Sequence, residues 1–386
     1  MSFLIRILLA LVAATPLHAQ QAPVRVGAAI SQSGALAALA ADYGRGLALW
    51  QDEINAAGGL LGRTVELRIH DDGSDAARAR ELYAQLIGEE KVELLVGPFG
   101  TAATLLAAGE AERARRVLIN GSGASRAVHK REPRYVFQTT VPNAAYGDAV
   151  LDVAGKSSVF ILARDDPASR EMAEATREVA LKQGLKAGDI EIYSLAASDF
   201  SAQVQKAKAA GADAWIAFGE VRDAAGMIRT FRKLGYAPAI FFSRAAGHPR
   251  LIEMLGQDAE FALGAADYRA DLRTPGNDRF VQTFMAKFGA PPSPAAAEGY
   301  AAGTVLAEAV RRAGTLEQEK LRETLAKLET GTVLGGYKVT QGGEQVAARP
   351  AVVQILKGRP EVVSPPPLAT AERQPYPPWS ERRILK

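Results

Sequence analysis

Hydrophobic positions along the chain alternate between short runs of branched residues and longer stretches with apolar residues at helical spacing. The first run is VRVGAAI at 24–30. It is followed by a stretch over about 42–57 in which Leu47, Trp50 and Ile54 recur at three- and four-residue intervals. Period-2 or continuous apolar runs are typical of strands, and the three-to-four spacing is typical of an amphipathic helix. The pattern predicts a strand followed by a helix.

The same alternation continues over the next part of the chain, with helical stretches at about 75–88 and from Thr101 onward. Further strands are predicted at 64–70, 92–97, 116–121, 136–140, 158–163, 190–195, 214–219 and 239–243. Strands that alternate with helices of this length form parallel sheets covered by helices on both faces. Because the rhythm restarts after 136–140, we expect an α/β protein with two doubly wound, Rossmann-like lobes.

The C-terminal third is less regular. Helices are predicted at 276–288, 295–313 and 317–328. The segments 333–340 and 349–358 then have the pattern of a hairpin around the turn Gly342-Gly343. Beyond Pro360 the chain is rich in proline, which predicts a tail that runs extended over the surface or is disordered.

Residues 1–19 have the pattern of a secretory signal. Arg6 precedes the apolar run 7–14, and the small residue Ala19 stands before the expected cut. The run is too short to span a bilayer, and the alternative is an apolar helix within the fold. The chain has no cysteine, which excludes disulfides, a catalytic thiol and a lipid-anchored cysteine. These features predict a periplasmic protein that is not lipid-anchored.

The charge of the chain gives little reason to expect a nucleic-acid partner. Its formal net charge is only +3, and removal of the leader takes away the positive charge of Arg6. Proteins that bind nucleic acid mainly through phosphates need a larger excess of lysine and arginine.

Two long runs carry a resemblance to a known family. They are EINAAGGLLGRTVELRIHDDGSDAARARELYAQLI at 53–87 and LLVGPFGTAATLLAAGEAERARRVLINGSGAS at 94–125. Together with 198–219, 298–314 and 334–358, they resemble periplasmic binding proteins of the leucine/isoleucine/valine type. The likeness extends over about 24–358.

The resemblance implies a type I periplasmic binding fold with a hinge that the chain crosses three times, near 140–142, 266–270 and 330–336. It implies a first lobe of 24–141 plus 269–331, a second lobe of 142–268 plus 332–360, and a tail at 361–386. The ligand would lie in the cleft between the lobes. An ABC-type permease in the inner membrane would receive it.

Two loops of the first lobe are candidates for binding the ligand. In doubly wound sheets, ligands bind at the carboxyl ends of strands, where helix N-termini offer unpaired N–H groups to an anion. Phe99, Gly100 and Thr101 lie where a strand enters a helix. The resemblance implies that Thr101 binds a carboxylate, and the alternative is an ordinary N-cap threonine.

The second candidate loop contains Gly121, Ser122 and Ala124. The resemblance implies that the Ser122 carbonyl holds the ligand's head group, and that a threonine hydroxyl is missing at Ala124, where Ser122 or Ser125 could replace it. An ordinary glycine-serine turn is the alternative.

Contacts from the first strand-to-helix loop are expected at Ser33 and Leu39. In this region the family often has an aromatic contact. Tyr43 is close by in sequence, and it could belong either to the pocket or to the core.

The second lobe departs from the family pattern. Ser169 stands where the family has a tyrosine, and Glu220 follows the strand at 214–219. Arg244 stands at or near the position of the acidic residue that pairs with the ligand's ammonium group. An arginine that faces the cleft would favour a second anionic group, whereas one that points to solvent would have no such role. We therefore expect a small carboxylate-bearing solute, either an amino acid or a related organic acid.

Nothing in the sequence favours an enzyme, a cofactor or a metal site. The four histidines lack metal-binding spacing, and no nucleophile elbow or phosphate loop is present. The acidic turn at 70–75 lacks the ligand spacing of a calcium loop, and we interpret Asp75 as a helix cap. A sensor or interaction module with the same fold is the alternative to a transport protein.

Overall fold

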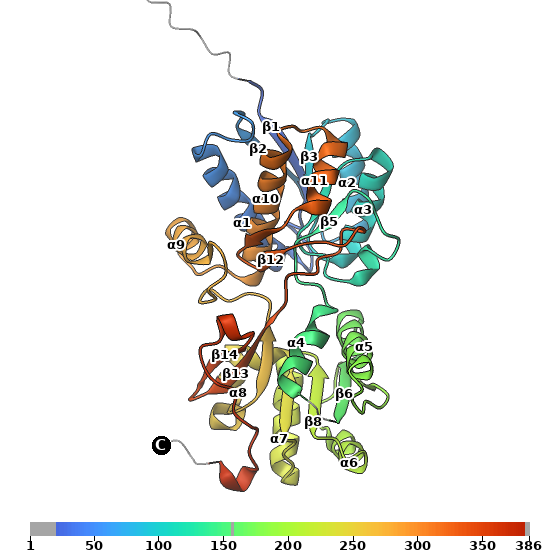
Figure 1. Ribbon diagram of the computed structural model, residues 1–386, viewed down its shortest axis with the longest axis vertical. Coiled ribbons are helices and arrows are strands. Elements are labelled where there is room, and N and C mark those ends of the chain that lie inside the picture. The colour runs from blue at the N-terminus through green and yellow to red at the C-terminus, as the bar shows by residue number, and fades with distance from the viewer. Residues whose placement is uncertain (1–20, 156–157, 383–386) are drawn as a thin grey trace, which may run out of the picture.

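The computed structural model describes residues 21–155 and 158–382, and it arranges them in two α/β lobes along the long axis of the molecule (Figure 1). The predicted leader lies outside the described residues. Within the described part, no helix combines the length and apolar character needed to cross a membrane.

The first lobe contains a fully parallel sheet in the order β2-β1-β3-β4-β5. Its strands are β1 Val24–Ala29, β2 Val65–His70, β3 Leu94–Val96, β4 Leu118–Asn120 and β5 Val136–Gln138. Its helices are α1 Ala37–Ala56, α2 Ala76–Gly88, α3 Thr101–Ala114, α9 Asn277–Phe288, α10 Pro294–Ala313 and α11 Gln318–Lys327. The last three come from much later in the chain.

The second lobe contains a sheet in the order β14-β13-β10-β9-β8-β6-β7. Its strands are β6 Val159–Arg164, β7 Glu191–Tyr193, β8 Ala214–Phe218, β9 Ile240–Ser243, β10 Leu263–Ala266, β13 Ala351–Leu356 and β14 Arg359–Ser364. Its helices are α4 Ala145–Ala154, α5 Pro167–Lys182, α6 Ser201–Ala209, α7 Val221–Leu234 and α8 Pro249–Leu255. β13 runs antiparallel to both β10 and β14, and the other pairs are parallel.

The chain passes between the lobes three times (Figure 1): from β5 to α4, from β10 toward α9, and from the short β11–β12 hairpin (Thr330–Thr332, Gly335–Tyr337) to β13. The carboxyl end of β5 leads into the second lobe, and the carboxyl end of β10 leads back into the first. Because parallel strands share one direction, the carboxyl edges of the two sheets face each other. This arrangement confirms the predicted fold class.

Two predictions for the C-terminal part are wrong. Segments 333–340 and 349–358 do not form a hairpin together: β12 pairs with β11, and β13 pairs with β14 and β10. Only a single bridge, between Val339 and Gln345, closes the turn at Gly342-Gly343. The sheet also continues past Pro360, because β14 extends to Ser364, so the tail begins later than expected.

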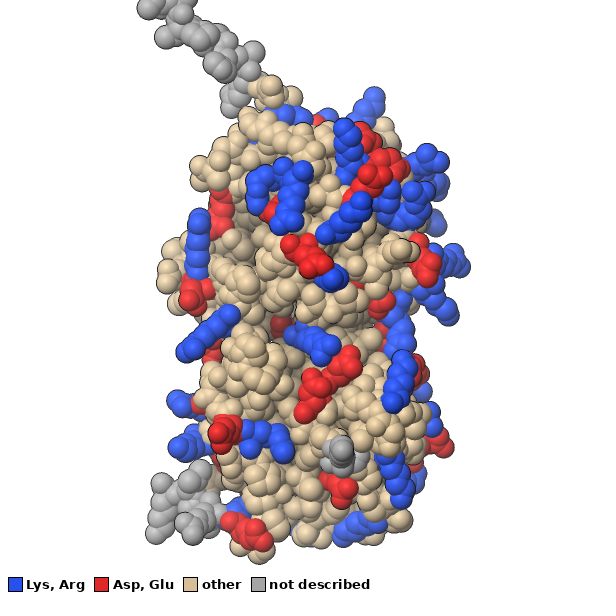
Figure 2. All heavy atoms as spheres, in the orientation of Figure 1, with Lys and Arg blue, Asp and Glu red and all other residues tan. Residues whose placement is uncertain are grey.

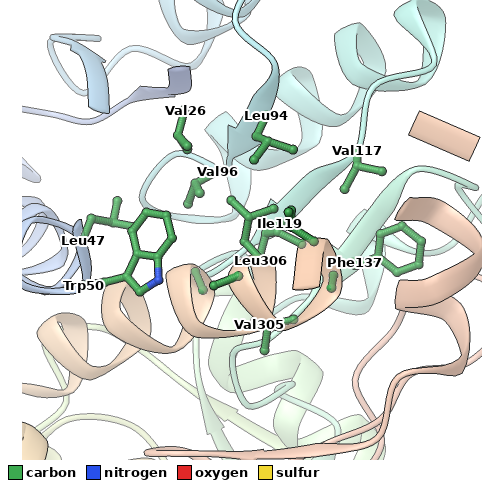
Figure 3. Packing of buried hydrophobic residues seen from close by; sticks show 14 of the residues in the cluster. Val26, Leu47, Trp50, Leu94, Val96, Val117, Ile119, Phe137, Val305 and Leu306 are labelled. Atoms are coloured by element: carbon green, nitrogen blue, oxygen red, sulfur yellow. The ribbon is translucent and has the colours of Figure 1, made fainter. Parts of the chain in front are cut away.

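Helix α10 packs closely on α1 over one face of the first sheet (Figure 3). The side chains of Leu47 and Trp50 on α1 and of Val305 and Leu306 on α10 are buried against the strands. A Cβ on Gly299 would lie 2.1 Å from the Tyr43 carbonyl oxygen, so only glycine allows this approach. The close contact fixes the first turns of α10 beside the carboxyl edge of the sheet.

Candidate ligand-binding site

The loop from β3 to α3 offers an open helix N-terminus at the carboxyl edge of the first sheet. Gly100 is the N-cap of α3, and its φ of 89° is a conformation that favours glycine. Thr101 is therefore the first helical residue and not the N-cap. Its partly exposed side chain makes no hydrogen bond to any described residue. The hydroxyl and the first N–H groups of α3 are thus free to bind an anion.

The loop after β4 lies beside this helix N-terminus. The Gly100 N–H donates to the Ser122 hydroxyl oxygen at 3.1 Å. Gly121 is required by packing, since a Cβ there would lie 2.3 Å from the Tyr43 hydroxyl oxygen. The Ala124 carbonyl accepts a hydrogen bond from the Asn143 N–H at 2.9 Å, which ties this loop to the first crossing.

Other residues expected around the first-lobe pocket are exposed, packed against another ring or used to cap a short helix. Leu39 lies in the first turn of α1 with 58% of its surface exposed. Phe99 packs against the Tyr43 ring at 5.9 Å between centroids, and Tyr43 itself is buried. Ser125 uses its hydroxyl to cap a short 3-10 helix, Arg126–Val128, so it does not replace the missing threonine at Ala124.

Ser33 belongs to a loop held by the acidic turn. Its hydroxyl donates to Asp71 Oδ2 at 2.7 Å, and this bond is the main reason why the pKa of Asp71 falls to about 2. Asp75 caps α2 through the N–H groups of Ala77 and Arg78, which confirms its prediction. In the described part of the chain, no acidic, histidine or cysteine cluster has the arrangement of a metal site.

In the second lobe, Ser169 and Glu220 belong to helix N-termini. Ser169 is buried, and its hydroxyl donates to the α5 N-cap residue Asp166 at 2.8 Å. Glu220 is the exposed N-cap of α7, within a capping box with Asp223. The sequence analysis missed Arg164, the last residue of β6, which lies 3.7 Å from Glu220.

Arg244 lies partly buried between the lobes and does not point into open solvent. Its guanidinium carbon is 5.7 Å from the centre of the Tyr146 ring, and its buried Nε has no hydrogen-bond partner among the described residues. The Tyr146 hydroxyl donates to Asp267 Oδ1 at 2.6 Å. The nearby Tyr146 and Asp267 raise the pKa of Arg244, while burial raises the pKa of Asp267.

Two hollows lie where the lobes meet. One of about 580 Å³ is lined by Tyr146, Glu220, Arg244 and Asp267, together with Pro294 of α10. The other, about 810 Å³, is lined by residues at the start of α5, by Glu344, and by Ser125, Arg126, Ala127, His129 and Lys130 of the first lobe. Figure 2 shows basic and acidic side chains close together at the waist between the lobes.

Glu298 and Thr140 also lie where the lobes meet, and the sequence analysis did not identify them. The Thr140 hydroxyl donates to Glu298 Oε1 at 2.7 Å. Burial raises the pKa of Glu298 to about 8. The available signal was a single acidic residue within the alanine-rich run PAAAEGYAAG of a predicted helix.

Two lobes that turn helix N-termini and polar loops toward a shared cleft define a solute-binding protein. The chain belongs to the periplasmic binding protein family, whose model matches residues 23–360. Among curated relatives, an amino acid binding protein of Pseudomonas aeruginosa is 26% identical. The match covers 84% of this chain and 87% of that protein. A Leu/Ile/Val-binding protein homolog of Brucella suis is 25% identical, with coverage of 85% of this chain and 86% of that protein.

Solved structures share the fold. A branched-chain amino acid ABC transporter protein of Rhodospirillum rubrum superposes with a TM-score of 0.79 at 22% identity, covering 88% of this chain and 99% of its own. A solute-binding protein of R. palustris in complex with benzoate gives a TM-score of 0.67 at 21% identity, covering 88% and 95%. The relatives are solute-binding proteins and not enzymes, as the sequence predicted.

Proposed function

We propose that this protein is the extracytoplasmic solute-binding component of an ABC importer and that it binds a small carboxylate-bearing solute between its lobes. The solute is an amino acid or a related organic acid. The protein works in the periplasm after removal of its leader, and an inner-membrane permease receives the solute from the closed form.

The N-terminus of α3, which has no side-chain cap, is the observation that carries this proposal. Thr101 presents its backbone N–H group and a hydroxyl without a hydrogen-bond partner among the described residues, at the sheet edge that faces the second lobe. The partial positive charge of a helix N-terminus stabilises a carboxylate. The ligands named for relatives and neighbours, amino acids and benzoate, are all carboxylates, which supports the same chemistry here.

Binding between the lobes explains how the solute would signal its presence. A solute that touches both lobes only when they are closed binds the closed form more tightly than the open form. This difference in affinity stabilises the closed form. Arg126 and Glu171 already connect the lobes: the Arg126 N–H donates to Glu171 Oε1 at 2.7 Å. The three crossings are the segments whose backbone would rotate.

A thermal-shift panel of amino acids, aliphatic acids and aromatic acids tests the proposal. We expect at least one acid to raise the Tm of the wild-type protein. Thr101→Ala should weaken the binding of that acid by at least about tenfold, because a hydrogen bond to a charged group contributes about 1.5–3 kcal/mol.

Thr283→Ala is the matched control, since it removes a hydroxyl on α9 that bonds only to its own helix. The proposal fails if no acid stabilises the protein, or if Thr101→Ala and Thr283→Ala respond alike.

A further inference from the structure

Glu298 is held at the junction of the two lobes by contacts from several elements. It lies in the second turn of α10, where the approach to α1 at Gly299 leaves no room for adjustment. Thr140, on the first crossing, donates its hydroxyl to Glu298 Oε1 at 2.7 Å. Thr140 is itself buried, so the carboxyl group is fixed from the hinge side.

The region around Glu298 has more acidic than basic groups. Within residues 21–155 and 158–382, no lysine, arginine or histidine lies within ion-pair distance of Glu298 or Asp267. Asp267 lies close enough to raise the pKa of Glu298 further by repulsion. Arg244 is the nearby cation, and Tyr146, Asp267 and Glu220 already act on it. Arg244 acts on Asp267, and among the described residues Glu298 has no such cation beside it.

A buried carboxylate without a cation is unfavourable, and it becomes favourable when a cationic ligand supplies the missing charge. An ammonium group has three N–H donors and no acceptor, so it suits a site made of carboxylate and hydroxyl oxygens. The charge balance around Glu298 therefore fits a cation better than a second anion.

The Ser122 hydroxyl joins this acidic wall to the N-terminus of α3. It accepts a hydrogen bond from the Gly100 N–H at 3.1 Å, and it also interacts with the Glu298 carboxyl group. The N-terminus of α3 and the acidic group are therefore separated by a single hydroxyl. That short separation matches an α-amino acid, whose carboxylate and ammonium are attached to one carbon.

We propose that Glu298, positioned by Thr140 and supported by Asp267, is the subsite for the ammonium group of an α-amino acid whose carboxylate binds at Thr101, the first residue of α3. This inference rests on the proposed function and makes it more specific. It places the acidic partner of the ammonium on the first lobe, on α10, and not on the second lobe at the position of Arg244. The solute is then an amino acid and not its deaminated counterpart.

Calorimetric titration with matched ligand pairs tests the inference. The probes are leucine against 4-methylpentanoate and phenylalanine against 3-phenylpropanoate, added to ligand-stripped protein at pH 7. The wild-type protein should bind one of the amino acids at least tenfold more tightly than its deaminated partner. Glu298→Gln keeps the shape and the acceptor for Thr140, and it should reduce that preference to about twofold or less.

The matched control is Glu308→Gln, on the same helix, where the carboxylate pairs with Arg311 and Arg312 and does not face the cleft. It should leave both affinities unchanged. A second measurement uses only the wild-type protein, in two buffers with different ionisation enthalpies. Amino acid binding should release a proton from Glu298, and binding of the deaminated acid should not.

The outcomes separate the two proposals. If the deaminated acid binds the wild type as tightly as the amino acid, or if no proton is released, the subsite is wrong while the proposed function stands. The same holds if Glu298→Gln and Glu308→Gln behave alike. If no small carboxylate binds the folded wild-type protein, the proposed function itself is wrong.

Discussion

Glu298 illustrates at the scale of one residue how a buried acidic side chain can reduce stability. Its folded-state pKa of about 8 lies above the ordinary value of 4.5, because burial disfavours the charged form. Above about pH 4.5, Glu298 loses its proton in the unfolded chain, whereas in the folded chain it retains the proton until about pH 8. The unfolded state is thereby favoured as pH rises through this window.

Glu298→Gln should therefore stabilise the free protein at pH 8 and should have little effect at pH 4. The substitution keeps an acceptor for the Thr140 hydroxyl. Thermal unfolding of both proteins at the two pH values measures the difference. Neighbouring groups such as Asp267 and Tyr43 are present in both proteins. An equal change in Tm at both pH values would contradict the raised pKa.

Single residues also show what the sequence could and could not reveal about the site. Gly100 and Thr101 were predictable because they directly follow a strand and begin a helix. Gly121 was expected beside the ligand, and the structure shows that Tyr43, which lies far away in the sequence, packs against it. Glu298 could not be identified, since its partner Thr140 is 158 residues away along the chain.

At the scale of helices and strands, local sequence patterns set where each element lies, and sheet topology sets which strands pair. The strands up to β9 and the helices between them could be predicted, because each depends on local periodicity and on local start and stop signals. The pairing of β13 with β10 and β14 could not, since it is decided by sheet topology. The glycine pair at 342–343 forms a turn, but the segments on its two sides pair with other strands.

Asp75→Ala should lower the free energy of unfolding by about 1 kcal/mol, because it removes the cap of two N–H groups at the start of α2. Urea denaturation measures this value. Asp189→Ala is the control, as that carboxylate is fully exposed and pairs only with Arg177. If Asp75→Ala lowered the free energy of unfolding no more than Asp189→Ala does, the cap would contribute little to stability.

The whole molecule includes a C-terminal segment that belongs to the second lobe. Tyr376 is buried, and its ring centre is 5.4 Å from that of Phe241. The Trp379 Nε1 donates to the Tyr236 carbonyl at 2.8 Å, and the Arg382 guanidinium carbon lies 3.7 Å from the Trp379 ring centre. Tyr236 lies between α7 and β9, at the end of the sheet opposite the cleft.

Tyr376→Ala should destabilise the protein by about 3 kcal/mol, as expected for a buried aromatic ring, while solute affinity stays within about twofold. Tyr376→Phe keeps the ring and removes a buried hydroxyl that has no partner in the described structure. Tyr376→Phe should therefore change the free energy of unfolding only slightly. Denaturation and calorimetry of the two variants measure both effects. Loss of affinity in folded Tyr376→Ala protein would instead give the tail a role in binding.

The two-lobed architecture has a clear functional consequence at this scale. Both sheets direct their carboxyl edges at one cleft, and the chain crosses between the lobes three times. Stability, in contrast, comes from the separate cores of the lobes. Changes deep in either core should alter Tm, and only changes at the facing edges should alter solute selectivity.

Calorimetric titration of the refolded, ligand-stripped protein with small amino and organic acids tests the central claim most directly. The account predicts submillimolar, one-to-one binding of at least one carboxylate, weakened by Thr101→Ala. Absence of binding across the panel, by protein whose circular dichroism and unfolding transition show that it is folded, would contradict it.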